Sequence, residues 1–213
     1  MMIGGRHLGS PSDPPATITV MLDDRSLVTF DVAPGFFLRF EPIASGRLEG
    51  DGTFAKLAVT ATNSAGGAVP PVAIEQFDVQ PPDAIELGFD SGWHEPEYNP
   101  ATGRSWRWMS ERATMALRGG KGDVTLTITG EATRRYFPRG SRFTVLVAGQ
   151  PVVTSDIGQD FALEVRIPRE LLVRGDGRVT FETDQMFIPG DREGTADRRH
   201  LGVRLYSVTA SSR

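Results

Sequence analysis

Apolar and polar residues alternate along most of the chain. The runs 17–22, 123–129 and 142–147 each place an apolar side chain at every second position, which is the spacing of a strand with one buried face. Turn-forming pairs such as Asp23-Asp24 and Gly119-Gly120 separate these runs. The pattern predicts an all-β protein built from many short strands.

Two segments leave room for helix. In 104–118, Met109, Ala113, Ala116 and Leu117 could form a helical stripe, but 113–118 alternates equally well and no capping box precedes it. We therefore predict a strand at 113–118. The run 168–172 predicts a single helical turn with Pro168 in the N1 position.

The chain matches itself when it is shifted by 125 residues. The shift superposes the following pairs: Thr19-Val20 on Thr144-Val145, Val28-Thr29 on Val153-Thr154, Phe36 on Phe161, Leu38 on Leu163, and Gly50-Asp51-Gly52 on Gly175-Asp176-Gly177. With a small extra shift, 72–77 meets 202–206. Strands and turns that match together indicate two related β units.

The repeat predicts an uneven division of the chain. We expect a complete jelly-roll β-sandwich at 83–213, preceded by a partial, related β unit at 1–82. Residues 83–125 have no counterpart in the first unit, so that unit should lack the opening strands of the sandwich. Unpaired strand edges invite association, so something must cover them.

Composition excludes several classes of function. The 213 residues include no cysteine, which removes disulfides and thiolate chemistry. The formal charge is −4, and residues 1–82 hold 5 basic and 9 acidic residues. Such a surface disfavours a nucleic-acid partner, and we interpret the arginine-rich run 134–142 as a solvated turn rather than a phosphate site. The first residues lack the apolar core of a signal peptide, and no apolar run is long enough to span a bilayer.

The segment 88–108 holds all three tryptophans and is the candidate for chemistry. Aromatic faces stack on sugar rings, and nearby polar groups bond to hydroxyls. The candidate carbohydrate-binding residues are Trp93, His94, Glu95, Tyr98 and Asn99. The alternative is core packing, with Trp106 and Trp108 pointing into the sandwich and Arg107 pointing out; for Trp93 and Tyr98 both alternatives stay open.

Glu95 and Glu97 are the only pair that suggests catalysis, because glycosidases use two carboxylates about 5–9.5 Å apart. Sequence proximity does not establish that geometry, and one of the two could instead pair with an arginine.

His94 suggests a metal or a general base, but no metal-ligand spacing accompanies it. Asp197 and Arg199 favour a half-buried ion pair. We expect no catalytic residue, no metal and no cofactor, since phosphate-loop, nucleophile-elbow and dinucleotide motifs are also absent from the sequence.

Taken in order, several short motifs over about 84–210 resemble a known family. These are Gly92-Trp93, Glu97, Arg107-Trp108, Ala113-Thr114-Met115-Ala116-Leu117 and Asp197-x-Arg199-x-Leu201-Gly202-Val203. They resemble the jelly-roll, galactose-binding-like domains beside the membrane-embedded catalytic part of bacterial glycosyltransferases and polysaccharide-assembly proteins. The resemblance implies a non-catalytic, extracytoplasmic β-sandwich that contacts glycan or lipid-linked sugar. It also implies that Glu97, Arg107, Trp108, Asp197 and Arg199 are structural.

This chain has neither transmembrane helices nor a transferase domain, so the family's localisation and activity do not carry over whole. Three hypotheses follow. The first is an accessory module that binds carbohydrate, in a longer polypeptide with a membrane glycosyltransferase domain. The second is a purely structural or interaction module that orients a membrane enzyme, which predicts an exposed apolar patch or an open strand edge on 1–82. The third is a glycoside-acting enzyme that uses Glu95 or Glu97.

Overall fold

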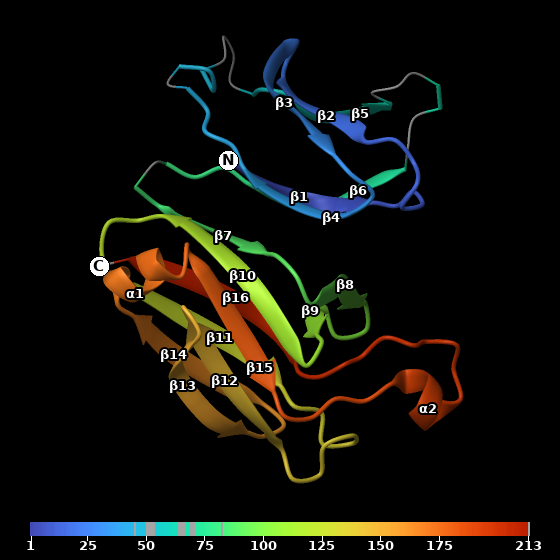
Figure 1. The fold of residues 1–213 in the computed structure, drawn as a ribbon, viewed down its shortest axis with the longest axis vertical. Helices are drawn as coiled ribbons and strands as arrows, with labels where there is room; N and C mark the ends of the chain where they lie inside the picture. Colours follow the sequence, from blue (N-terminus) through green and yellow to red (C-terminus); the bar gives the residue numbers. More distant parts are fainter. Residues whose placement is uncertain (45, 50–53, 64–66, 69–70, 82, 213) are drawn as a thin grey trace. The chain divides into compact units, whose positions relative to one another are not determined.

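The computed structural model describes residues 1–44, 46–49, 54–63, 67–68, 71–81 and 83–212. Over these residues the chain forms four antiparallel sheets and two short helices (Figure 1), which confirms the all-β class. It divides into two compact units, Met1–Val79 and Gln80–Arg213. The division falls three residues before the expected boundary after residue 82, which itself lies outside the described residues.

The first unit has two three-stranded sheets. Its strands are β1 (Met2–His7), β2 (Ala16–Leu22), β3 (Arg25–Val32), β4 (Gly35–Phe40), β5 (Leu57–Asn63) and β6 (Val72–Asp78). They pair in the orders β4-β1-β6 and β3-β2-β5. Ile3 from one sheet and Ile18 and Val20 from the other share one apolar core, so the two sheets pack face to face.

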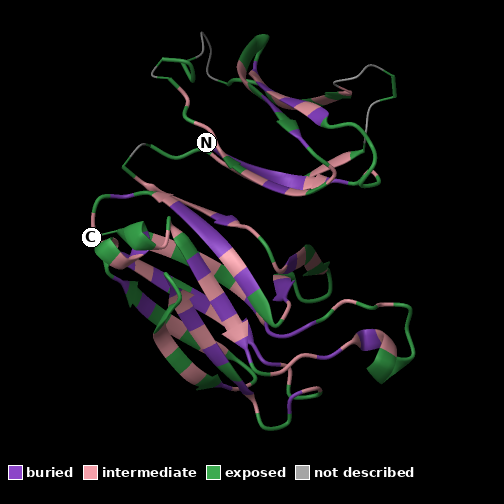
Figure 2. Cartoon of the chain, viewed as in Figure 1, coloured by how far each residue is buried: buried purple, intermediate pink, exposed green. Residues whose placement is uncertain are grey.

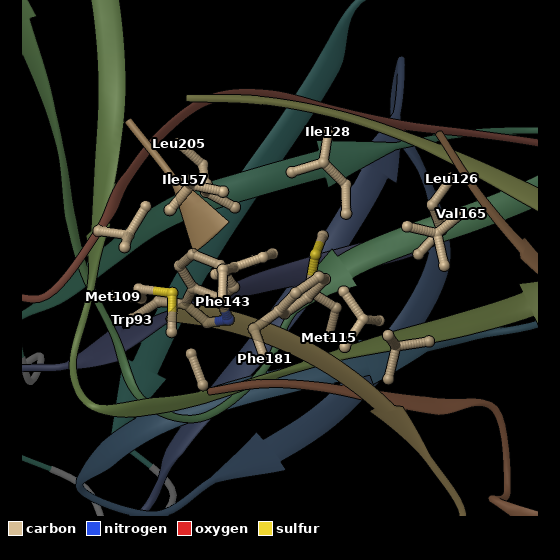
Figure 3. Packing of buried hydrophobic residues seen from close by; sticks show 14 of the residues in the cluster. Trp93, Met109, Met115, Leu126, Ile128, Phe143, Ile157, Val165, Phe181 and Leu205 are labelled. Carbon is tan, nitrogen blue, oxygen red and sulfur yellow. The ribbon is translucent and has the colours of Figure 1, made fainter. Parts of the chain in front are cut away.

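The second unit has two five-stranded sheets. Its elements are β7 (Ile85–Phe89), β8 (Trp93–Asn99), β9 (Arg104–Met109), β10 (Arg112–Gly119), β11 (Val124–Glu131), β12 (Ser141–Val147), β13 (Gln150–Ile157), β14 (Phe161–Ile167), α1 (Arg169–Arg174), β15 (Arg178–Thr183), α2 (Pro189–Glu193) and β16 (Arg204–Ser212). The orders are β13-β12-β15-β10-β7 and β14-β11-β16-β9-β8. Buried positions alternate with more exposed ones along its strands (Figure 2), and Phe143, Phe181 and Ile128 join the two sheets in one core (Figure 3).

Both ambiguous segments are resolved. The predicted strand at 113–118 is confirmed as the interior of β10, whose Ala113, Met115 and Leu117 are buried. The predicted helical turn is confirmed as α1, but the helix begins at Arg169. Pro168 therefore takes the N-cap position rather than N1.

The strand orders of the two units correspond. Sheets β4-β1-β6 and β3-β2-β5 of the first unit repeat the orders β14-β11-β16 and β13-β12-β15 of the second. Four strands of the second unit, β7 to β10, have no counterpart among the described strands of the first. They extend the two sheets beyond β15 and β16, with β10 paired to β15 and β9 paired to β16.

The β2–β3 and β12–β13 hairpins also agree residue by residue. Each hairpin has its register shift at the same point, between Val20 and Met21 in one and between Val145 and Leu146 in the other. The cross-strand pairs Thr19–Thr29 and Thr144–Thr154 both join their hydroxyl oxygens at 3.2 Å. The first turn residues, Asp23 and Ala148, both have φ 51°. All these positions are 125 residues apart, whereas the matched turn at 50–52 lies outside the described residues.

Glycine occupies the matching bulge in both units for a steric reason. The register shifts between Gly4 and Gly5 in the β1–β6 pair, and between Thr129 and Gly130 in the β11–β16 pair. A Cβ atom on Gly5 would lie 2.0 Å from the Ala73 carbonyl oxygen, and one on Gly130 would lie 2.5 Å from the Arg204 carbonyl oxygen. Both bulges therefore depend on the absence of a side chain.

We predict that Gly130→Ala destabilises the second unit by about 1–3 kcal/mol, because the added methyl group meets backbone that cannot rotate away. Gly158→Ala is the matched control, since its Cβ would meet nothing closer than 4.0 Å. Denaturant unfolding of both variants measures the difference. Equal unfolding free energies would contradict the steric role.

Candidate functional site

Trp93 is a core residue. It opens β8, its ring packs edge-on at 4.9 Å from Phe89 and 5.8 Å from Phe181 (centroid distances), and its indole N–H donates to the Thr114 carbonyl at 2.8 Å. Its side chain lies among Met109, Phe143 and Phe181 (Figure 3). This burial contradicts its assignment to a carbohydrate-binding surface, because no ring face is left for a sugar.

Two more of the predicted binding residues lie at the end of the β8–β9 hairpin. Tyr98 is exposed. Asn99 accepts a hydrogen bond from the Ala101 amide at 2.9 Å, which holds the turn. Glu95, earlier on β8, is also exposed.

His94 is engaged by backbone. Its Nε2 lies 2.8 Å from the His200 carbonyl oxygen, so this nitrogen carries the proton. Ser110 Oγ is 3.3 Å from the same nitrogen, and a protonated nitrogen cannot take the hydroxyl proton. The pair is therefore not an activated nucleophile with its base.

The expectation that Arg107 points outward is wrong. Its side chain is buried, its guanidinium lies 4.8 Å from the centroid of the Phe89 ring, and it donates to the His94 carbonyl at 3.0 Å. A delocalised guanidinium tolerates this position because it stacks on an aromatic face. Trp108 packs in the core as expected, at 5.8 Å from Phe187, whereas Trp106 is only half-buried.

A cavity of about 440 Å³ lies elsewhere in the second unit. Its walls come from β8, β9, the turn after β11, the segment 187–201 that contains α2, and β16. The lining residues are Glu97, Trp108, Thr133, Arg135, Tyr136, Phe187, Pro189, Glu193, Thr195, Asp197, Arg199, Leu201 and Arg204. Four of the five residues that the resemblance marks as structural are among them, and none of the five predicted carbohydrate-binding residues is.

One wall of the cavity is aromatic. Tyr136 stacks on Phe187 with ring centroids 3.7 Å apart and planes 14° apart. Trp108 and Phe137 also pack edge-on against the Phe187 ring, each with a distance of 5.8 Å between ring centroids. This packing holds Tyr136 in one orientation beside the polar groups.

Arg199 organises the polar wall. Its Nε and Nη2 donate to Asp197 at 3.0 and 2.7 Å, and its Nη1 donates to Glu97 at 2.9 Å. The second Glu97 oxygen accepts from the Trp106 indole N–H at 2.9 Å. The predicted Asp197–Arg199 pair is thus confirmed and extended to Glu97. The hydrogen bonds from Arg199 lower the pKa of Asp197, and Asp197 in turn raises the pKa of Arg199.

Two further carboxylates pair with residues that line the cavity, Glu193 from within the lining and Glu131 from outside it. Glu193 accepts from the Tyr136 hydroxyl and pairs with Arg135 at 3.2 Å. Burial raises the pKa of Tyr136, and its hydrogen bond to Glu193 raises it further. Behind the cavity, burial acts to raise the pKa of Glu131, but hydrogen bonds from Tyr206, Arg204 and Thr133 outweigh burial and lower it.

Hydrogen bonds within the protein engage the acidic groups of this cavity. Both Glu97 oxygens already accept hydrogen bonds from side chains, so neither is poised to protonate or attack a substrate. Among the described residues, no group of three or more histidine, aspartate or glutamate side chains could hold a metal ion. What the cavity offers is a set of hydrogen-bonded donors and acceptors beside an aromatic face.

Sequence reasoning missed the aromatic half of this cavity. Tyr136 belongs to the run 134–142, which we interpreted as a solvated turn. No sequence motif around Phe187 indicated a functional role. Tyr136 and Glu193 are 57 residues apart, so no local spacing connects them. The only feature of the sequence that pointed to this wall was the presence of two aromatic residues, Tyr136 and Phe137, in an arginine-rich run.

No protein-family model matches the chain, and no curated protein matches its sequence. Within the described ranges the two helices have six and five residues, and no helix there could cross a membrane.

We predict that Trp93→Ala lowers the unfolding free energy of the second unit by about 3–5 kcal/mol, as truncation of a large buried aromatic does. Tyr98→Ala should change it by less than about 0.5 kcal/mol, because the ring is exposed. Guanidinium titration followed by tryptophan fluorescence or circular dichroism measures both. A mild effect of Trp93→Ala would return this residue to the list of surface candidates.

The lowered pKa of Asp197 predicts a pH dependence of stability. Its folded pKa lies below the ordinary 3.8, so the Asp197–Arg199 pair stabilises the fold above about pH 4 and this contribution is lost as pH falls through the folded pKa. Asp197→Asn should therefore reduce stability at pH 7 and flatten the loss of stability as the pH falls below the ordinary pKa of 3.8. The exposed Asp160→Asn is the control, and parallel stability–pH curves for wild type and Asp197→Asn would refute the role of the pair.

Proposed function

We propose that the second unit is a jelly-roll, galactose-binding-like sandwich that binds carbohydrate as a non-catalytic accessory module. The observation that carries this proposal is the cavity that sets the stacked Tyr136–Phe187 pair beside the Glu97–Arg199–Asp197 network. The binding residues are therefore not those suggested by the tryptophan-rich segment. Two facing antiparallel sheets of five strands support the jelly-roll assignment.

The charge of the cavity favours a neutral ligand. Its lining contains three carboxylates, on Glu97, Glu193 and Asp197, and three guanidinium groups, on Arg135, Arg199 and Arg204. A phosphate or nucleotide site would carry an excess of positive charge. A sugar instead needs acceptors and donors in alternation with an apolar face, and this lining supplies both.

Size and rigidity support the same ligand class. A volume of about 440 Å³ lies in the range of small-molecule sites and suits one or two sugar rings. The polar groups are already held by one another, so they lose little conformational freedom when a ligand binds. Glu97 and Asp197 accept hydroxyl hydrogen bonds, and Arg135 and Arg204 donate them.

The proposed role follows from the resemblance together with this site. The module binds glycan or lipid-linked sugar on the extracytoplasmic side of a bacterial membrane, next to a membrane glycosyltransferase. The corresponding strand orders of the two units support an origin of the first unit by duplication of the same sandwich. A purely structural role is favoured for the first unit alone, because among the described strands each of its sheets has only three.

Carbohydrate binding is tested by a glycan array followed by calorimetric titration of the full chain. Tyr136→Ala and Arg199→Ala should each weaken binding of the array hits by roughly tenfold or more, since each removes a group central to the site. Tyr98→Ala, an exposed tyrosine outside the cavity, is the matched control and should bind as wild type does. Absence of binding across neutral and acidic glycans, or loss confined to Tyr98→Ala, would overturn the proposal.

A further inference from the structure

Two segments that line the cavity carry an excess of positive charge. Residues 133–139, the turn after β11, hold three arginines and no acidic residue. Residues 187–201, which contain α2, hold three arginines and three acidic residues. Together the two segments therefore have three more basic than acidic residues, in a chain whose formal charge is −4.

Tertiary structure joins these two segments. Glu193 on α2 accepts a hydrogen bond from the Tyr136 hydroxyl and pairs with Arg135 at 3.2 Å. The Phe187 ring stacks on Tyr136 with centroids 3.7 Å apart. We interpreted 134–142 as a solvated turn because this basic run is isolated in the sequence, but the fold places the arginines of the α2 segment beside it.

The acidic residues of the α2 segment are already paired. The pairs are Asp191–Arg198 at 2.8 Å, Glu193–Arg135 at 3.2 Å and Asp197–Arg199 at 2.7 Å. None of these carboxylates is therefore left to neutralise the remaining arginines of the two segments.

Three arginines remain, and they are defined here as the rim arginines: Arg134, Arg139 and Arg192. All three are exposed. Within the part of the chain that the structure describes, none of their guanidinium groups makes a hydrogen bond or an ion pair. The excess positive charge of the two segments is thus the charge of the rim arginines.

The rim arginines lie beside residues of the cavity lining. Arg134 stands between Thr133 and Arg135, which both belong to the lining. Arg192 directly precedes Glu193, which also belongs to it. Since consecutive Cα atoms are about 3.8 Å apart, a long guanidinium side chain at either position can meet a group that projects from the cavity.

This distribution of charge suits an anionic group outside a neutral cavity. The lining has equal numbers of carboxylates and guanidinium groups, so an uncharged sugar ring fits there. The rim arginines raise the positive potential next to it, and the apolar ring surfaces nearby strengthen that field. A guanidinium group also presents a planar fork of donors that matches two oxygens of a carboxylate or a phosphate.

We propose that the rim arginines bind the anionic group of an acidic glycan whose sugar ring occupies the cavity. This inference rests on the carbohydrate binding proposed above and narrows its ligand class. The ring lies against the aromatic wall and bonds to the polar wall. A phosphate or carboxylate attached to it projects onto the rim arginines.

Matched pairs of glycans test this charge preference. Glycans that end in glucose, galactose or mannose are compared on one array with their 6-phosphate and uronic acid counterparts, and the best pair is titrated calorimetrically with the full chain. In about 50 mM sodium chloride the acidic member should bind roughly tenfold tighter or more. In about 500 mM the ratio should fall to about threefold or less, because salt screens exposed charges. Inorganic phosphate alone should bind more weakly than the glycan phosphate.

Single substitutions assign the preference to the rim. Arg134→Gln and Arg192→Gln should each lower the ratio of acidic to neutral affinity by roughly threefold. Both should leave the affinity for the neutral glycan unchanged, because neither residue lines the cavity. Arg174→Gln is the matched control, since it removes an exposed guanidinium from the last turn of α1, and it should leave the ratio unchanged. Circular dichroism checks that all three variants fold.

The outcomes separate this inference from the proposed function. A neutral glycan that binds as tightly as its acidic counterpart would overturn the role of the rim arginines and leave the carbohydrate site standing. An acidic preference that survives both rim substitutions would do the same. Inorganic phosphate that binds as tightly as the glycan phosphate would refute the requirement for a sugar ring. Absence of binding to every glycan would overturn the carbohydrate site, and this inference with it.

Discussion

Each unit depends on the packing of one sheet's apolar face against the other. In the second unit, Phe143 and Phe181 from one sheet meet Ile128 and Leu126 from the other, and in the first unit Ile18 and Val20 meet Ile3. Burial of these side chains supplies the main favourable free energy of folding. It also imposes a geometric demand, because every inward side chain must be covered on all sides, including along the edges of its sheet.

That demand explains how the two units differ. Their central hairpins share a register, a bulge and a turn conformation, so the local folding is the same. The second unit meets the demand with β7 to β10, which bury Val179 and Leu205. Among its described residues the first unit has no such strands, and Leu57 on β5 and Ile74 on β6 stay exposed.

The strands that complete the second sandwich also build its site. β8 and β9 carry Glu97 and Trp108 to the cavity, where Arg199 joins Glu97 to Asp197. Buried or half-buried ions are costly unless each is paired and hydrogen-bonded, and here each nitrogen of the Arg199 guanidinium donates to a carboxylate. The same pairing fixes Glu97 between Arg199 and the Trp106 indole.

The strand pattern, the helical turn and the Asp197–Arg199 pair were predictable from the sequence because each depends on neighbours within a few residues. The shift of 125 residues was equally readable, since it is a property of the linear chain. Trp93 and Arg107 were not predictable, because turn residues around Trp93 suggested a surface loop, and simple alternation placed Arg107 outside. The register shift within the β8–β9 pair and the Phe89 ring reverse these expectations. The cavity was decided by tertiary structure alone, since Glu97 and Arg199 are 102 residues apart and only the folded sheets bring them within hydrogen-bonding distance.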